Sequence, residues 1–178
     1  MLRLPHRIVT TGLAIVVGAP PAAIVGAYAG ATFPDIDIRM GIPHRTWTHW
    51  LPLYGILMAG GGIAWVMAGS PLARLLEELF MGFVVGAILH IIEDAPTHSG
   101  IPILTPNGKH FSFNWTYSGG MFEKVVALAV VGLVFWTIVK DPFSFERRMV
   151  QGTINAIGAL DPRLAEHIVN ILPGGLVG

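Results

Sequence analysis

Seven side chains with metal-ligand chemistry are concentrated near the ends of the apolar segments of this chain. They are His6, Asp35, Asp37, His44, His49, His90 and Asp94. Imidazole and carboxylate together suit zinc, manganese or iron, whereas a set of oxygen ligands alone suits magnesium or calcium. One zinc ion takes about four ligands, so seven candidates indicate two ions, or one ion with supporting and acid–base residues around it. Zinc is the first expectation.

The composition places these residues in a membrane protein. Of the 178 residues, 53% are hydrophobic and 12% are charged, whereas about a quarter of the residues in a soluble domain are charged. Eleven basic residues balance eleven acidic ones, so no basic surface for nucleic acid is expected. Because the chain has no cysteine, any metal must be bound by histidine and carboxylate.

Five apolar helices are expected to position the candidate ligands. A helix needs about 20 residues to cross the hydrocarbon core of a bilayer. The apolar segments predict helices over 4–18, 21–33, 46–68, 72–94 and 121–139. Pro20 and Pro21 separate the first two, which are short, and this indicates a hairpin. No convincing signal-peptide cleavage site follows the first segment, so we expect it to stay in the chain.

Two further features complete the predicted fold. Asn107-Gly108 lies between short apolar runs and indicates a small β-hairpin. After Lys140 the pattern predicts two amphipathic helices on the membrane surface. The second of these is expected to begin with Asp161 as its N-cap and Pro162 in its first turn.

The predicted fold class is all-α. It is a compact polytopic membrane bundle of about five helices, with a small β-hairpin loop and C-terminal amphipathic helices. We expect one domain over 1–178, with the bundle in 1–140 and the amphipathic segment in 141–178.

The connectivity brings the candidate ligands to one side of this bundle. If the first two helices form a hairpin, His6 at the start of one lies on the same side as Asp35 beyond the end of the other. The third helix crosses and the fourth returns, which places His90 and Asp94 on that side as well. The segment after Lys140 is expected on the opposite side. Charged groups at helix ends avoid the roughly 2.5–3.5 kcal/mol cost of insertion at the bilayer centre.

Small residues recur every four positions on two of the predicted helices. One ridge holds Gly82, Gly86, His90 and Asp94, and the other holds Ala22, Gly26 and Gly30. Small residues at this spacing let helix backbones approach closely in lipid. We therefore expect the two ridges to cross and to bring Asp35 and Asp94 together. The alternative is that glycine is simply common in membrane helices.

Several candidate ligands also have a structural interpretation. Asp35 and Asp37 are common turn residues, but in an extended segment they would point the same way and act as ligands. His90 and Asp94 share a helix face and could bind one ion or form a hydrogen bond. His6 could be an interfacial anchor, and only the connectivity favours it as a ligand.

The segment HRTWTH supplies further candidates. His49 is the stronger ligand, because it lies in the first turns of a predicted helix. His44 could be a ligand, an acid–base group or an interface histidine. Arg45 could clamp a phosphate or pair with a carboxylate, and the sequence leaves both open. The weaker candidates are His98 and His110 in a loop, His167 as a structural residue, and Glu93 and Glu123 as at most supporting residues.

Two stretches of the chain resemble a known family. GATFPDIDIRMGIPHRTWTHW and GAILHIIEDAPTHSGIPILTP are similar to the YdjM-like family, described as LexA-binding, inner-membrane-associated, metal-dependent hydrolases. The resemblance covers about residues 6–125. The matched positions are Pro34, Asp35 and Asp37; His44, Arg45, Thr48 and His49; His90 and Asp94; and Thr97, Gly100 and Pro106. The chain departs from the pattern at Trp50, where a small serine is usual, and at Glu93, which precedes the aspartate.

The residues and the resemblance together predict a multi-pass inner-membrane, metal-dependent hydrolase. It would act on a phosphoester or lipid-linked ester at the bilayer interface, with water activated by one or two metal ions. The expected ligands are His6, Asp35, Asp37, His49, His90 and Asp94, with His44 and Arg45 as catalytic residues. Membrane lipid and a lipid-like or phosphoester substrate are the expected partners, and a second copy or another membrane protein stays open.

Other functional classes fit the sequence less well. A non-catalytic membrane assembly or regulatory protein could use the same cluster as a closed structural metal site. A metal or proton transporter would need polar residues deeper in the third and fifth helices, which offer almost none. No G-x-S-x-G or P-loop motif is present to support serine or nucleotide hydrolysis.

Overall fold

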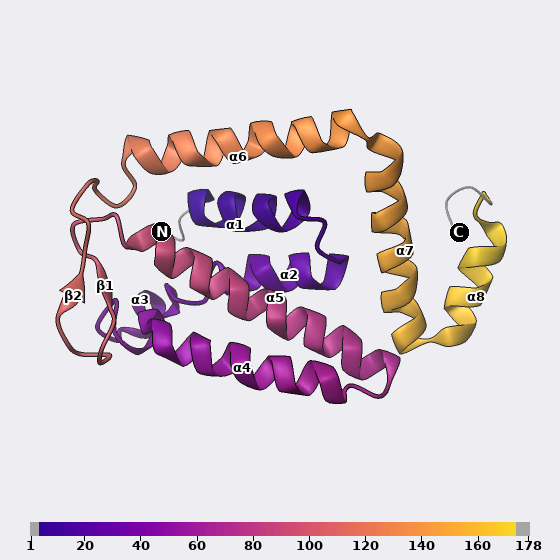
Figure 1. Cartoon of the computed structure of the whole chain (residues 1–178), viewed down its shortest axis with the longest axis horizontal. Helices are drawn as coiled ribbons and strands as arrows, with labels where there is room; N and C mark the ends of the chain where they lie inside the picture. Colours follow the sequence, from indigo (N-terminus) through magenta and orange to yellow (C-terminus); the bar gives the residue numbers. More distant parts are fainter. Residues whose placement is uncertain (1–3, 174–178) are drawn as a thin grey trace.

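The computed structural model describes residues 4–173, which form eight α-helices and a two-stranded sheet (Figure 1). The helices are α1 (Leu4–Val16), α2 (Pro21–Gly30), α3 (Ile36–Met40), α4 (Leu51–Met67), α5 (Pro71–Asp94), α6 (Met121–Lys140), α7 (Pro142–Leu160) and α8 (Pro162–Ile171). A 3₁₀ turn at Trp47–His49 precedes α4. Seven of these helices correspond to the predicted five-helix bundle and its two C-terminal helices. The eighth, α3, was not predicted.

The segment that contains α3 corrects one expectation. We expected Asp35 and Asp37 in an extended stretch, but Asp35 is the N-cap of α3 and Asp37 lies in its first turn. Gly41 ends the helix with a left-handed φ of 67°, and its N–H bonds the carbonyl of Asp37. A glycine in this conformation is a common helix terminator. The two carboxylates therefore lie on a helical turn rather than on one face of a strand.

Helix α5 is the centre of the fold and packs against α1, α2, α4 and α7. Its fully buried residues Val84, Ala87 and Ile91 form a core with Tyr54 of α4. In Figure 1, α1 lies between α5 and α6, and α7 runs across the end of the bundle opposite to α3 and the sheet. The polar loops that follow α2 and α5 are thus collected at one end.

The crossing of α2 and α5 confirms the expectation drawn from the two ridges of small residues. A Cβ atom on any of four glycines would collide with a backbone carbonyl of the other helix: Gly26 with Leu79, Gly30 with Phe83, Gly82 with Ala23 and Gly86 with Ala27. The two backbones touch because these residues have no side chain. This contact fixes the end of α2 beside the end of α5.

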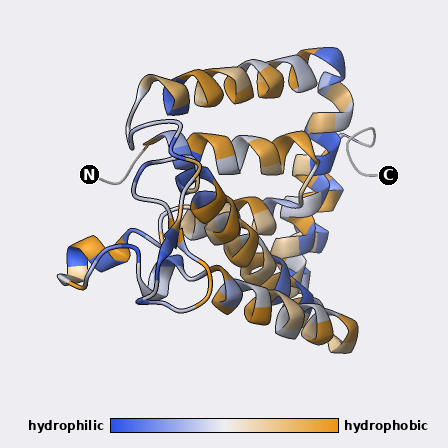
Figure 2. Cartoon of the chain, turned by 60° about the vertical axis from the view of Figure 1, so that its left-hand side comes forward, coloured by the Kyte–Doolittle hydropathy of each residue, from blue (hydrophilic) through white to orange (hydrophobic). Residues whose placement is uncertain are grey.

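Two of the described helices, α5 and α6, are long and apolar enough to cross a membrane. Helices α1, α2 and α4 are apolar but shorter. Large hydrophobic side chains are exposed along α4 and α6, including Ile56, Ile63, Val66, Leu128, Phe135 and Trp136, and both helices are largely hydrophobic in Figure 2. An apolar surface of this extent is one that lipid covers. How many times the chain crosses a membrane stays a prediction.

The loop between α5 and α6 contains the small hairpin that the sequence predicts. Strands β1 (Ile101–Pro102) and β2 (His110–Phe111) pair antiparallel. The turn is shifted by one residue from the expectation, because Gly108 N–H bonds Thr105 O and places Pro106 and Asn107 at its centre. Proline suits this position because its φ is already set for a turn.

The second C-terminal helix begins as predicted. The Asp161 side chain accepts hydrogen bonds from two N–H groups in the first turn of α8, and Pro162 is the first residue of that helix. Asp141 caps α7 in the same way through Ser144 N–H. These caps satisfy N–H groups that have no partner within a helix. The location of α7 and α8 on a membrane surface stays a prediction.

Candidate metal centre

Four histidine rings meet at the end of the bundle where α2 and α5 finish, and in each ring Nδ1 contacts the protein. His6 Nδ1 is 2.8 Å from Glu93 Oε2, His44 Nδ1 is 2.9 Å from Asp37 Oδ1, and His90 Nδ1 is 2.7 Å from Ala31 O. His49 Nδ1 is 3.1 Å from Thr48 Oγ1 and 3.4 Å from Asp37 Oδ2. Because a carbonyl or carboxylate oxygen accepts, Nδ1 carries the proton and Nε2 is left as a ligand.

The Nε2 atoms of His49 and His90 face two carboxylates. His49 Nε2 is 3.4 Å from Asp94 Oδ2 and 3.8 Å from Asp35 Oδ1, and His90 Nε2 is 3.5 Å from Asp35 Oδ1 and 3.7 Å from Asp94 Oδ2. Four donors in a tetrahedron around zinc, at bond lengths of about 2.0–2.1 Å, lie roughly 3.3 Å apart. The spacing of these four atoms is close to what one ion requires.

The other two rings flank this set, one on each side. His6 Nε2 is 3.8 Å from Asp94 Oδ1, and His44 Nε2 is 3.9 Å from Asp35 Oδ1. The same residues therefore also divide into two groups of three, whose ligand atoms lie within 4.8 Å of one another: His6, His90 and Asp94, and Asp35, His44 and His49. Three protein ligands are what an open, catalytic metal site uses.

Burial strengthens the interpretation of this cluster as a ligand set. The Nε2 atoms of His6, His49 and His90 are buried and have no hydrogen-bond partner among the described residues. Each such atom costs about 1–3 kcal/mol if nothing binds it. The His44 side chain differs, because it is 33% exposed. Three of the four rings are thus buried in protein, and the cluster reaches solvent at His44.

Asp37 does not face the Nε2 atoms as a ligand would. Its Oδ1 contacts His44 Nδ1, and its Oδ2 accepts from Arg45 N–H at 3.1 Å and from Thr48 Oγ1 at 2.7 Å. The reason is the helical turn of α3, because residues two apart on a helix point in nearly opposite directions. Asp35 therefore faces the cluster, and Asp37 supports the rings from outside it.

Arg45 pairs with a carboxylate, which is one of the two alternatives that the sequence leaves open. Its side chain is 4% exposed, and Nη2 donates to Asp94 Oδ1 at 2.7 Å and to Ser118 Oγ at 3.0 Å. Nη1 donates to Thr97 Oγ1 and to Gly100 O at 2.7 and 2.8 Å. Arg45 also has a left-handed φ of 61°, which costs a residue with a side chain roughly 1–3 kcal/mol. The guanidinium holds Asp94 against the loop after α5.

The charge states of two cluster residues suit metal binding. Burial lowers the pKa of His49, so the ring is neutral at neutral pH, as a metal ligand must be. Burial raises the pKa of Asp35, but the nearby His90 ring lowers it further than burial raises it. Asp35 is therefore a carboxylate at neutral pH.

Residues that the sequence ranks as at most supporting, or does not single out, form hydrogen bonds at the site. Glu93 fixes His6 through Nδ1, and the Glu123 side chain accepts from Gly119 N–H at 2.8 Å. Thr97 and Ser118 were missed as partners of Arg45. Thr97 belongs to the T-x-x-G stretch of the resembled family, which is a usable signal, whereas nothing in the sequence singles out Ser118.

Three further histidines lie outside the cluster. His98 bonds the Asn114 side chain and packs on Tyr117, and His110 Nδ1 contacts Ser99 O at 2.9 Å. His167 is exposed on α8. None of the three belongs to the two groups of residues that could hold a metal ion.

Comparison with known proteins shows the family of the chain. No curated protein and no solved structure matches the chain. A family model described as YdjM inner membrane protein matches residues 1–158, a range that contains all of the candidate ligands. The buried His and Asp groups thus lie within a region shared with other members. The chain belongs to the YdjM inner membrane protein family.

Proposed function

We propose that the chain is a metal-dependent hydrolase that acts on a phosphoester or a lipid-linked ester at the membrane interface. The observation that supports this most is the division of six side chains into two groups of three ligands. Two ions with three protein ligands each would keep coordination positions open for water and substrate. Mixed imidazole and carboxylate ligands favour zinc, with manganese or iron as alternatives.

The rival is a structural site, and the outer histidines argue against it. One ion bound by Asp35, His49, His90 and Asp94 would be closed and would leave no place for a substrate. Such a site needs neither His6 nor His44, yet both rings are held at Nδ1 by carboxylates with Nε2 toward the cluster. Carboxylates that orient histidine in this way are typical of metal ligands.

The surrounding residues would prepare the site for hydrolysis. When bound, the metal would lower the pKa of water to about 7 and polarise the ester. Arg45 keeps Asp94 in place, and its four Nη contacts to the protein make it a positioning residue rather than a phosphate clamp. His44 lies where the cluster meets solvent, so substrate and water would approach past this ring.

The aromatic loop that joins the site through Ser118 suits an amphiphilic substrate better than a fully soluble one. The loop after β2 exposes aromatic side chains, with Trp115 and Tyr117 each about three-quarters exposed. Tyrosine and tryptophan favour the headgroup level of a bilayer. The same loop supplies Ser118, which bonds Arg45. The metal ligands would then lie near the level of the lipid headgroups.

Metal content separates the hydrolase from its rival. Elemental analysis of the purified protein should give two ions per chain, and His6→Ala or His44→Ala should each reduce this to one. His167→Ala, on the exposed face of α8, is the matched control and should keep two. One ion in all four proteins would favour the closed structural site.

Turnover then tests the hydrolase itself. The metal-loaded protein should hydrolyse phospholipid or lipid phosphate faster than soluble phosphoesters, and His90→Ala should abolish this activity. If His44→Ala keeps two ions but loses turnover, His44 transfers protons instead of binding metal. A protein that holds two ions and hydrolyses none of these esters would refute the proposed reaction.

A further inference from the structure

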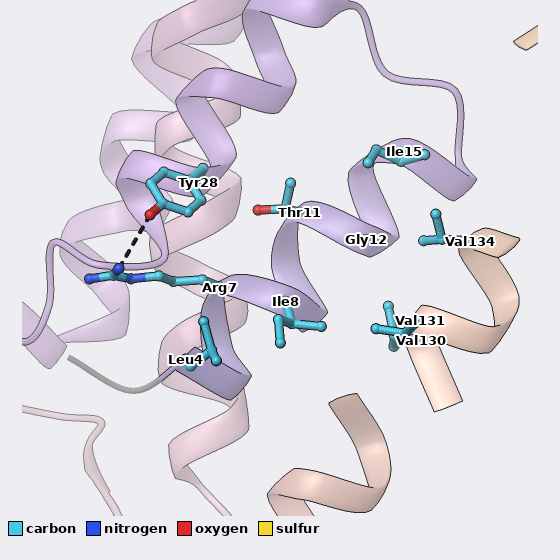
Figure 3. A pocket seen from close by; sticks show the side chains of 10 residues that line it. All are labelled: Leu4, Arg7, Ile8, Thr11, Gly12, Ile15, Tyr28, Val130, Val131 and Val134. Carbon is cyan, nitrogen blue, oxygen red and sulfur yellow. Dashed lines mark hydrogen bonds between the residues drawn. The ribbon is translucent and has the colours of Figure 1, made fainter. Parts of the chain in front are cut away.

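A second feature of the bundle lies on the other face of α1, away from the metal centre. A groove of about 330 Å³ runs between α1 and α6 and reaches α2 (Figure 3). Its walls are mostly apolar and include Ile8, Ile15, Val130, Val131 and Val134. Cavities that bind small ligands are of about this size or larger.

One part of the groove is polar. Arg7 Nη1 donates to the Tyr28 hydroxyl at 3.2 Å, and the guanidinium lies 5.5 Å from the centre of the Tyr28 ring. Arg7 Nε and Thr11 Oγ1 are both buried and have no hydrogen-bond partner among the described residues. No ion pair joins Arg7 to a carboxylate in the part of the chain that the structure describes. A cation at one end of an apolar groove thus has donors left for an anion.

The shape of the groove limits what can occupy it. Gly12 brings α1 against α6, because a Cβ there would collide with Val130. The groove beside this contact has mostly β-branched and aliphatic walls and a volume of about 330 Å³. A single 5.4 Å turn of a protein helix 10–12 Å across needs more than about 400 Å³, so a helix does not fit, whereas an extended hydrocarbon chain is thin enough.

We propose that the groove binds an acyl chain of an anionic phospholipid, with the phosphate of that lipid at Arg7. Apolar walls bury the chain, and the guanidinium matches the negative charge of the headgroup. Thr11 and Tyr28 supply hydroxyl groups beside Arg7. The inference does not depend on hydrolysis, because neither the groove walls nor Arg7 belong to the metal ligands.

The phospholipid that the purified protein retains tests whether Arg7 binds the lipid phosphate. The protein purified in detergent is mixed with equal amounts of phosphatidylglycerol and phosphatidylcholine of the same acyl chains, and bound lipid is counted by native mass spectrometry. The expected result is one retained phosphatidylglycerol, favoured about tenfold or more over phosphatidylcholine. Arg7→Gln should remove this preference. The control is Lys124→Gln, which removes one positive charge from an exposed position on α6 and should keep the preference. Equal retention of both lipids by the unchanged protein would overturn the proposal.

A groove-filling variant tests the chain site separately. Val131 lines the groove and is half exposed, so Val131→Trp should fill the groove without disturbing the core. It should lose the retained phosphatidylglycerol, while Val139→Trp, an exposed position outside the groove on the same helix, should keep it. A circular dichroism spectrum and a melting temperature equal to those of the unchanged protein show that both variants are folded. Retention by Val131→Trp would refute the assigned site.

Discussion

The α2–α5 and α1–α6 interfaces of this protein are packed in different ways. Glycines bring the α2 and α5 backbones into contact at four places. Between α1 and α6 the one comparable glycine, Gly12, meets the Val130 side chain, and a groove remains beside it. At these four glycines no space is left between the α2 and α5 backbones, whereas the side-chain contact between α1 and α6 leaves a groove beside it.

This difference in packing corresponds to the candidate metal ligands that each pair of helices holds in place. Asp35 lies just beyond α2, and His90 and Asp94 occupy the last two turns of α5, so the backbone contact sets the distance between ligands. The hydrogen bond from His90 Nδ1 to Ala31 O, 2.7 Å long, crosses the same interface. Catalytic and metal sites need supporting elements that hold ligands within a fraction of an ångström. The less tightly packed pair, α1 and α6, contributes only His6 to the cluster.

The largest effect is expected from adding one carbon atom to the tight interface. In Gly86→Ala the new Cβ would collide with the backbone of Ala27, and a backbone cannot move aside as a side chain can. We expect a loss of about 3 kcal/mol, which lowers the melting temperature by about 6–12 °C for a chain of this length, together with reduced metal content. Thermal unfolding followed by circular dichroism measures the first effect, and elemental analysis the second. An unchanged melting temperature would mean that the helices are not in backbone contact.

A smaller effect is expected at the residue that orients the rings. Asp37→Asn keeps the shape of the side chain but removes the charge that faces His44, Arg45 N–H and Thr48. Loss of such a supporting carboxylate typically weakens metal binding by about 10- to 100-fold. Metal titration should show this loss while the metal content at saturating zinc stays normal. Asp141→Asn, at the start of α7, is the control and should change neither. Complete loss of binding would make Asp37 a ligand after all.

The sequence predicted much of this arrangement because its signals are periodic. The apolar segments locate five of the eight described helices and the amphipathic pattern after Lys140 locates two more. Small residues at intervals of four predict that α2 and α5 touch. Helix connectivity then brings Asp35, His49, His90 and Asp94 together without any knowledge of side-chain geometry. The facing nitrogen and carboxylate oxygen atoms of those four side chains lie 3.4–3.8 Å apart in the structure.

What the sequence could not predict depends on single backbone angles. The role of Asp37 follows from the five-residue helix α3, which is too short to show a periodic pattern. The direction of Arg45 depends on its own left-handed φ, an unusual conformation for a residue other than glycine. The groove beside α1 could not be found either, because it depends on how far α6 stands from α1.

A modest effect is expected at the looser interface. In Gly12→Ala the new Cβ would meet the Val130 side chain, which can rotate or shift toward the groove. We expect a loss below about 1 kcal/mol, at the lower end of the range for overpacking, and unchanged metal content. Melting temperatures compared with Gly86→Ala measure the contrast. Equal destabilisation by the two substitutions would show that the α1–α6 pair is as tightly packed as α2–α5.

The smallest effect, with the opposite sign, is expected on the outer face of α6. Gly132 is exposed, and a Cβ there would meet nothing within 4 Å. Because alanine is favoured over glycine in a helix by roughly 0.8–1.0 kcal/mol, Gly132→Ala should leave the melting temperature unchanged or raise it slightly. The measurement is the same unfolding experiment, so the three alanine variants form one series. If Gly132→Ala instead destabilised the protein, the exposed face of α6 would have to pack against something beyond the single chain. Because small residues mediate close contacts between membrane helices, that outcome would point to a second copy or another membrane protein on α6, and size-exclusion chromatography of the same variant would then show a smaller particle.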